Sequence, residues 1–374
     1  MDLPVPGVYS WSSNIFNPVG AEYIVMEKAG GVPLFQLWAK MTQLSKLELI
    51  KGLIKLENQL ASIRFPAYGC LSYCVGPSCE RAYMLQTSDS SMDLNVNTGP
   101  WSSISAFGKA IANTQINRIT NGVQTRRGNF YHGTSAEQIS LLRDTMQITE
   151  SLDTHPILSR HAQPILWHSD LHMGNIFVSP DDPSRIVSLI DWQSTSILPA
   201  FLQAQWPEFL KPPANYPEGF VKPTLPDGFE NLDSGDKALA TLEWNQATIA
   251  KAYEVSNFLE NRQAHNAMNV PRVFKELFVR CGEVSEYGVI PLRTCLIEIF
   301  ENWIPLGFTG VCPAVQELAK TCLDTDAEEW IPPELDFEEK QRQNKELLGM
   351  FIERMEGEKA ADEPTKMWPF SNGL

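Results

Sequence analysis

The residues of this chain that are best suited to chemistry lie in one stretch near its centre. Residues 167–176 read Trp-His-Ser-Asp-Leu-His-Met-Gly-Asn-Ile, and Asp191 follows a later apolar run. Phosphoryl transfer requires one carboxylate that accepts or orients the substrate hydroxyl, and a second carboxylate with an amide oxygen that hold Mg²⁺ against the nucleotide phosphates. Asp170 supplies the first group, and Asn175 with Asp191 supply the metal pair. The residue types therefore predict a phosphotransferase site.

The spacing lets one loop present Asp170 and Asn175 to the same cleft, but two other interpretations stay open. Asp, His and Asn are also common in polar turns, where their side chains satisfy backbone groups. Alternatively, His168, Asp170 and His172 alternate along the chain, so they would share one face of a strand and bind the metal ion of a hydrolase. That second interpretation leaves Asn175 without a role.

The elements that must position these residues are short strands. Apolar runs at residues 165–167, 176–178 and 186–190 are separated by the polar stretch and by a turn at residues 179–183. This pattern predicts a strand, loop, strand, turn, strand unit. The loop and the end of the last strand carry the candidate residues.

Helical periodicity surrounds this unit on both sides. Ser45 with Glu48, and Ser135 with Gln138, have the spacing of capping boxes and predict helix starts. The expected helices span about residues 45–65, 102–117, 135–153, 236–264, 272–280, 291–303, 313–323 and 337–355. Strands are expected at residues 7–11, 22–28, 68–75 and 81–86, and a proline-rich loop after residue 206. Together these elements predict an α+β protein whose C-terminal part is mainly helical.

Composition excludes several classes of protein. The chain has 374 residues and a formal net charge of -15, which disfavours binding to nucleic acid or to an anionic membrane surface. No run approaches the ~20 apolar residues that a membrane-spanning helix needs, so we expect a soluble protein. The seven cysteines form an odd set without a CxxC, which favours reduced thiols over a disulfide framework or a zinc site.

The central motifs resemble those of a known superfamily. His168-x-Asp170-Leu171-His172-x-x-Asn175-Ile176, followed by Ile190-Asp191-Trp192, is similar to the catalytic and metal-binding motifs of the aminoglycoside phosphotransferase and choline kinase superfamily, which has a protein-kinase-like fold. Residues 23–31 resemble the fifth strand and hinge of that fold, and residues 4–6 resemble the lead into its fourth strand. Residues 190–196 with 205–207 resemble the fungal branch related to the altered inheritance of mitochondria protein 9 family.

The resemblance implies a role for each matching residue. Asp170 would be the catalytic base, and Asn175 and Asp191 would bind Mg²⁺. The hinge segment at Met26, Glu27 and Ala29 would bind the adenine of ATP, the last two through their backbone. His168 and His172 would support the loop. The implied activity is transfer of the γ-phosphoryl group of ATP to a hydroxyl of a small molecule.

The N-terminal part departs from the family pattern. Only about twenty residues precede the hinge strand; they contain neither a G-x-G-x-x-G nor a lysine before Lys28. We therefore expect an N-lobe reduced to two strands and the hinge over residues 1–31. Either the chain is a truncated form of a complete kinase, or it is a natural protein that lacks the rest of the N-lobe. A helical C-lobe would span residues 32–355, with a catalytic loop at 166–178 and a metal-binding segment at 186–193. Residues 356–374 would form a flexible tail.

Two hypotheses of function follow from these features. The first is the phosphotransferase. The second is a pseudokinase-like binding or scaffold protein that lacks the glycine-rich loop and the strand lysine, and whose apolar N-terminal strands bind a partner or a second copy. We expect a soluble intracellular protein, cytoplasmic or mitochondrial; the mitochondrial location is implied by the family resemblance alone.

Overall fold

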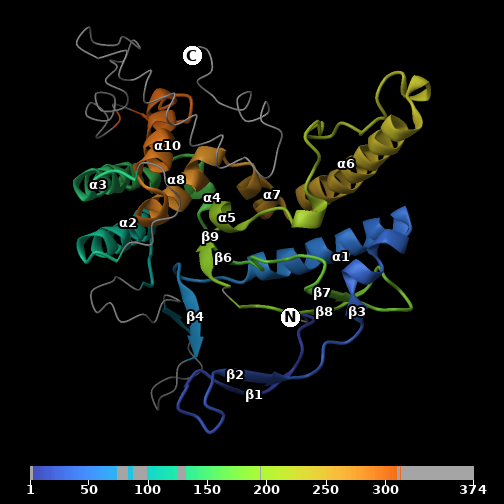
Figure 1. The fold of residues 1–374 in the computed structure, drawn as a ribbon, viewed down its shortest axis with the longest axis horizontal. Coiled ribbons are helices and arrows are strands. Elements are labelled where there is room, and N and C mark those ends of the chain that lie inside the picture. Colours follow the sequence, from blue (N-terminus) through green and yellow to red (C-terminus); the bar gives the residue numbers. More distant parts are fainter. Residues whose placement is uncertain are drawn as a thin grey trace, which may run out of the picture. The chain divides into compact units, whose positions relative to one another are not determined.

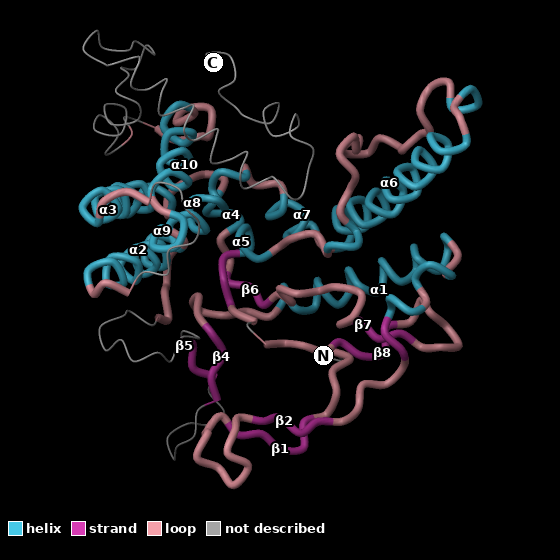
Figure 2. Tube along the Cα trace, viewed as in Figure 1, coloured by secondary structure: helices cyan, strands magenta, loops and turns pink. Residues whose placement is uncertain are grey.

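The chain folds into short antiparallel sheets and a larger set of helices (Figures 1 and 2). The computed structural model describes residues 3–73, 83–86, 99–123, 132–193, 195–309 and 312, which belong to one compact unit, Met1–Pro313. The helices expected at residues 313–323 and 337–355, and the tail at 356–374, lie outside the described residues. The α+β prediction, with a mainly helical C-terminal part, is confirmed.

The strands that the structure describes form four small antiparallel sheets, of which three bear on the candidate site. β1 (Val8–Ser12) pairs with β2 (Tyr23–Met26) in a hairpin at the N-terminus. β3 (Val32–Pro33), β7 (Ile176–Val178) and β8 (Ile186–Leu189) form a three-stranded sheet with β7 in the middle. β6 (Pro164–Leu166) pairs with β9 (Ile197–Pro199), while β4 (Cys70–Tyr73) pairs with β5 (Tyr83–Gln86).

A glycine allows the chain to enter the three-stranded sheet after the hairpin. Gly31 has φ 81°, and a Cβ at this position would lie 2.3 Å from the carbonyl oxygen of Val178. An L side chain is excluded by both the backbone conformation and the lack of space. Gly31 therefore permits the close approach of β3 to β7, and this approach joins the N-terminal hairpin to the strands around the central loop.

The helices form two groups. In the first, α1 packs against α6, and α7 continues the chain after α6; these helices span Gln43–Ser62, Ser234–Glu260 and Arg262–Met268. In the second, four helices contact one another (Figure 2): α2 (Ile104–Thr120), α3 (Ser135–Leu152), α8 (Arg272–Gly282) and α10 (Val289–Glu301). The shorter helices are α4 (Leu158–His161), α5 (Ala200–Gln203), α9 (Val284–Tyr287), and the 3₁₀ helices η1 (Leu34–Gln36), η2 (Trp38–Lys40), η3 (Glu208–Leu210) and η4 (Phe229–Asn231).

Three details of the expected helices are wrong. Thr42, not Ser45, caps α1, because the Thr42 hydroxyl accepts the backbone N–H of Ser45. Thr134 caps α3 and forms a capping box with Glu137, one residue before the expected pair. The expected helix over 236–264 is two helices, because Asn261 leaves the helical conformation and its side chain caps α7.

The core that supports the centre of the chain lies between α1, α6 and the three-stranded sheet. Its fully buried side chains include Ile50, Leu53 and Ile54 from α1, and Ile176 and Leu189 from the strands. The second helix group has its own apolar contacts, such as the stacked rings of Phe107 and Phe278. Among the described residues, no helix is both long enough and apolar enough to cross a bilayer.

Candidate active site

The central loop, residues 167–175, runs from β6 to β7 and is anchored by its apolar residues. Trp167 is 2% exposed and packs among small side chains of α5 and α7. Leu171 is 8% exposed and belongs to the core beneath α1. Between and beside these anchors, Asp170 and His172 have exposed side chains. Alternation of buried and exposed residues therefore fixes the loop backbone and presents its polar groups outward.

Ile190 joins this loop to the segment that carries Asp191. The Nε2 atom of His168 lies 2.9 Å from the Ile190 carbonyl oxygen, so this ring nitrogen donates its proton there. The backbone N–H of Ile190 donates to the carbonyl of Asn175 at 3.1 Å. Both hydrogen bonds involve the residue directly before Asp191. The two predicted parts of the site are thus held together through the backbone.

Within the loop, Asn175 and the histidine ring of His172 fix the backbone. The Asn175 amide nitrogen donates to the carbonyl of Asp170 at 2.9 Å, and Asn175 is only 5% exposed. Because this bond engages the nitrogen, the amide oxygen is the end of the side chain that can meet a cation. The Nδ1 atom of His172 accepts the backbone N–H of Gly174 at 3.0 Å, and its Nε2 lies 3.8 Å from the Asp170 carboxylate.

Asp191 adopts an unusual backbone conformation. Its φ of 65° makes it the one non-glycine residue with positive φ among those the structure describes, and its side chain is exposed. Aspartate tolerates this region better than most residues, but it still costs free energy. Strained residues of this kind persist where surrounding structure fixes them, and they concentrate at functional sites. Here the hydrogen bonds of Ile190 supply that fixation.

An apolar cavity of about 590 Å³ lies beside Asp191; we name it the hinge cavity. It brings Met26 at the end of β2 to the same cavity as Asp191, although the two residues are far apart in the chain. The other lining residues are mostly apolar and come from the N-terminal segment, β1, β2, β6 and the residues around Asp191: Leu3, Val5, Pro6, Val8, Ile24, Leu166, Ile190, Trp192 and Gln193. Such a volume suits the flat, largely apolar base of a nucleotide.

The other two expected hinge residues lie just past this cavity. The backbone N–H of Glu27 donates to the carbonyl of Gly7 at 2.7 Å, which continues the hairpin pairing by one residue. Of the two backbone groups of Glu27, the carbonyl is therefore the one that a ligand would meet. Neither Glu27 nor Ala29 lines the hinge cavity; Ala29 is half-buried, and Glu27 is exposed.

Asp170 and His172 line a second, smaller cavity of about 150 Å³, which we name the loop cavity. Its far side contains Glu57 of α1, which is 3% exposed and accepts the hydroxyl of Tyr253 of α6, at 2.9 Å to Oε2. Burial raises the pKa of the Glu57 carboxyl to about 8, although the hydrogen bond from Tyr253 opposes the shift. Glu57 is therefore largely protonated at neutral pH. Glu57 could not be identified from the sequence, because it resembles any charged position on an amphipathic helix.

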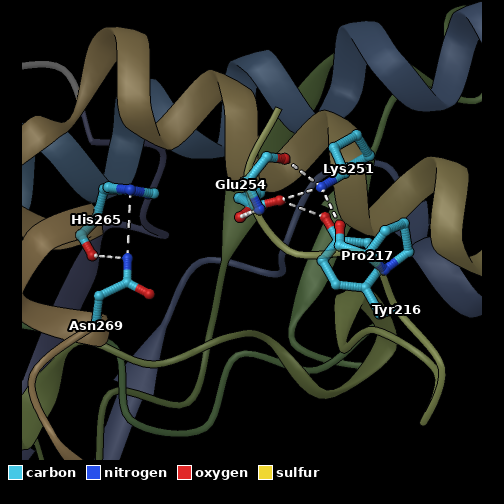
Figure 3. A network of polar contacts seen from close by, with 7 residues as sticks. Tyr216, Pro217, Lys251, Glu254, His265 and Asn269 are labelled. Atoms are coloured by element: carbon cyan, nitrogen blue, oxygen red, sulfur yellow. Dashed lines mark hydrogen bonds and ion pairs between the residues drawn. The ribbon is translucent and has the colours of Figure 1, made fainter. Parts of the chain in front are cut away.

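The remaining wall of the loop cavity is residues 205–211, and this segment is fixed to its neighbours. Gln205 donates its amide to the carbonyl of Ser169 at 2.9 Å. Further along, Lys251 and Glu254 of α6 hold the segment at Tyr216 and Pro217 (Figure 3). The Lys251 ammonium lies 2.6 Å from the carbonyl of Pro217, and the Tyr216 hydroxyl donates to Glu254 at 2.5 Å. These contacts with α6 hold the proline-rich segment in place at Tyr216 and Pro217.

The Glu254 carboxylate is the centre of that network. Burial alone would raise its pKa, but donors from Lys251, Tyr216 and the backbone of Gly219 outweigh burial and hold the pKa below its ordinary value. In the same view, Asn269 donates its amide to the carbonyl of His265 at 2.8 Å. Glu254 is therefore a charged partner of Lys251, and both hold the loop in place.

The donor chemistry at the site fits Mg²⁺ better than the metal ion of a hydrolase. Asn175 and Asp191 offer an amide oxygen and a carboxylate, the hard oxygen ligands that Mg²⁺ takes together with water and phosphate oxygens. In the part of the chain that the structure describes, no group of three or more His, Cys, Asp or Glu side chains is arranged to hold a metal ion. The alternative cluster of His168, Asp170 and His172 is therefore not formed, because His168 is buried and turned to Ile190.

Comparison with known proteins finds distant relatives. No family model matches the chain. It is 25% identical to a subtelomeric hrmA-associated cluster protein of Aspergillus fumigatus, over 88% of this chain and 74% of that protein. It is 26% identical to the altered inheritance of mitochondria protein 9, mitochondrial, of Lachancea thermotolerans, over 81% of this chain and 56% of that protein. The predicted resemblance to that fungal group is confirmed.

Solved structures similar to this chain include aminoglycoside phosphotransferases. One is the ADP-bound crystal structure of APH(2'')-Ib, with a TM-score of 0.37 and 12% identity over 83% of this chain and 78% of that chain. Another is the streptomycin, ATP and APH(2'')-IIa ternary complex, with a TM-score of 0.34 and 13% identity over 83% of this chain and 77% of that chain.

Proposed function

We propose that this chain is an ATP- and Mg²⁺-dependent phosphotransferase that acts on a hydroxyl group of a small molecule. The observation that carries the proposal is the attachment of Asp191 to the central loop through Ile190, which places Asp191 beside both that loop and the hinge cavity. A base-binding cavity, an acidic group and a hydroxyl-orienting loop are the parts that phosphoryl transfer requires.

Each candidate residue would have its own role in the reaction. The Asp170 carboxylate would orient the substrate hydroxyl and accept its proton. The hydroxyl oxygen would bond to the γ-phosphorus of ATP while the bond from this phosphorus to the β–γ bridging oxygen breaks, which releases ADP. Asn175 and Asp191 would hold Mg²⁺, which neutralises phosphate charge when bound. Met26 and the backbone of Glu27 and Ala29 would contact the adenine, and His168 and His172 would support the loop.

A test of the reaction compares Asp170→Asn with the wild type in ATP-dependent phosphorylation of a panel of small alcohols. Removal of the proton acceptor is expected to lower turnover at least about 100-fold, the usual contribution of a general base. The matched control is Asp181→Asn, an exposed aspartate in the turn between β7 and β8. Product formation that survives in Asp170→Asn would contradict the assignment.

A second candidate function is a binding or scaffold protein. It is favoured by the apolar side chains on the hairpin, where Tyr9 is 74% exposed and Ile24 is 62% exposed. A surface of this kind suits a protein partner or a second copy of the chain.

The mitochondrial names of the altered inheritance of mitochondria protein 9 relatives support a mitochondrial location for either function.

A further inference from the structure

A third cavity, of about 480 Å³, adjoins the loop cavity and differs from it in charge. We name it the basic cleft. Gln205, Trp206 and Lys211 line both cavities, so the two meet at this wall. Among the lining residues that the structure describes, three are cationic, Lys211, Arg272 and Lys275, and none is acidic.

The positive charge of the basic cleft is opposite in sign to the net charge of the chain. The chain carries 45 acidic residues and only 30 lysines and arginines, so an all-basic lining does not follow from composition. Apart from Gln205, the other described lining residues are mainly apolar and include Phe201, Met268 and Val270. The cleft therefore combines an apolar floor with positive charge, which complements an organic anion.

Of the three cations of the cleft, Lys275 is the one that is available to bind an anion. Lys211 forms an ion pair with Glu208, and Arg272 forms one with Glu276 at 2.8 Å. Lys275 is half-buried and has no ion pair or hydrogen bond among the residues that the structure describes. Burial lowers the pKa of Lys275, and the charge of Lys211 lowers it further. A half-buried ammonium with this neighbour is stabilised by an anion that reaches both lysines.

We propose that the basic cleft binds an anionic group, a carboxylate or a phosphate, of the acceptor substrate, whose hydroxyl lies at Asp170 in the adjoining loop cavity. The identity of the occupant as a substrate rests on the proposed phosphotransferase function, whereas the anion binding itself does not. An acceptor of this class carries an apolar body between its hydroxyl and its anionic group, because apolar residues line the cleft together with the cations.

The test measures binding of phenyl phosphate by calorimetry without Mg²⁺ or ATP, so that the nucleotide site is not engaged. Phenol and benzylamine serve as neutral and cationic counterparts of the same size, and inorganic phosphate as the anion without an apolar body. Lys275→Met is expected to weaken phenyl phosphate binding about tenfold or more, from the usual strength of a charged hydrogen bond. Lys275→Arg should retain binding, and Lys55→Met, at an exposed lysine of α1, should leave it unchanged.

The outcomes separate this proposal from the proposed function. Equal binding of phenol, or equal binding by Lys275→Met, would overturn the anion site. Inorganic phosphate that binds as tightly as phenyl phosphate would overturn the claim of an organic anion, because the apolar floor would then contribute nothing. If the wild type does not bind ATP in a Mg²⁺-dependent way, the phosphotransferase function is contradicted. Anion binding that depends on Lys275 would still support the anion site.

Discussion

Ile190 shows how a residue without functional groups in its side chain organises a site. Its carbonyl accepts from His168 and its N–H donates to Asn175, so the backbone at this one position connects the central loop with Asp191. Asp191 can then remain at positive φ, because the residue before it is held on both sides. The candidate residues therefore depend on backbone hydrogen bonds more than on contacts between their own side chains.

Glu57 gives a prediction at the same scale. The pKa of its carboxyl is about 8 in the folded protein, against an ordinary value of 4.5. Between these values the folded protein holds a proton that the unfolded chain has lost, so the free energy of unfolding falls as pH rises from about 5 to about 8 and then levels off. The contribution of this one group is up to about 1.4 kcal/mol per pH unit.

Glu57→Gln should remove that contribution. The glutamine amide oxygen can still accept the Tyr253 hydroxyl, but the side chain no longer titrates. Urea unfolding between pH 5 and 8 is expected to show a flatter decline in the variant than in the wild type. Glu48→Gln, an exposed position on the same helix, should follow the wild type. A Glu57→Gln profile parallel to the wild-type profile would mean that Glu57 is ionised in the folded protein.

Residue types could be read from the sequence here, but not their partners. The spacing of Asp170, Asn175 and Asp191 indicated one site, and the structure places them on a loop and a strand end joined at Ile190. Glu57 could not be found in this way, because its partner Tyr253 lies on α6, almost two hundred positions later. Only the packing of α1 on α6 brings them together.

At the scale of elements, two glycines inside helices have opposite surroundings. A Cβ at Gly52 of α1 would meet nothing within 4 Å. A Cβ at Gly108 of α2 would lie 2.8 Å from Thr149 of α3 and 3.2 Å from Phe278 of α8. Gly108 therefore lies at a close contact of α2 with α3 and α8, whereas Gly52 only weakens its helix.

Alanine at these two positions should change stability in opposite directions. Gly52→Ala is expected to raise the free energy of unfolding by about 0.5–1 kcal/mol, because alanine loses less backbone entropy on folding. Gly108→Ala is expected to lower it by about 1–3 kcal/mol, because the added methyl group overpacks the contact among α2, α3 and α8. Urea unfolding at one pH measures both. Stabilisation by Gly108→Ala would show that α2 does not pack this closely.

Helices could be predicted from periodicity, but their ends depended on single residues. The apolar spacing of α1, α3 and α8 identified these helices. Thr42 caps α1 three residues before the expected Ser45, and Thr134 caps α3 one residue before the expected Ser135. Threonine and serine are both good capping types, so only the backbone conformation decides between them. The break at Asn261 interrupts a continuous helical pattern, so no change of period marked it.

At the scale of the whole molecule, the hinge cavity depends on segments that no local pattern could relate. Met26 ends the N-terminal hairpin, while Asp191 follows β8, and the close approach of β3 to β7 at Gly31 connects their surroundings. The sequence resemblance indicated both residues as parts of a nucleotide site. Their common cavity is a property of the folded chain.

The measurement that tests this account most directly is ATP binding by calorimetry, with and without Mg²⁺, on this chain and on Asp191→Ala. We expect binding that requires Mg²⁺ and that Asp191→Ala weakens about tenfold or more, because the variant lacks the carboxylate that would hold the cation. Asp181→Ala, at an exposed aspartate in the turn between β7 and β8 and outside the hinge cavity, should bind as the wild type does. No binding at millimolar ATP, or binding that needs neither Mg²⁺ nor Asp191, would contradict the proposed phosphotransferase site.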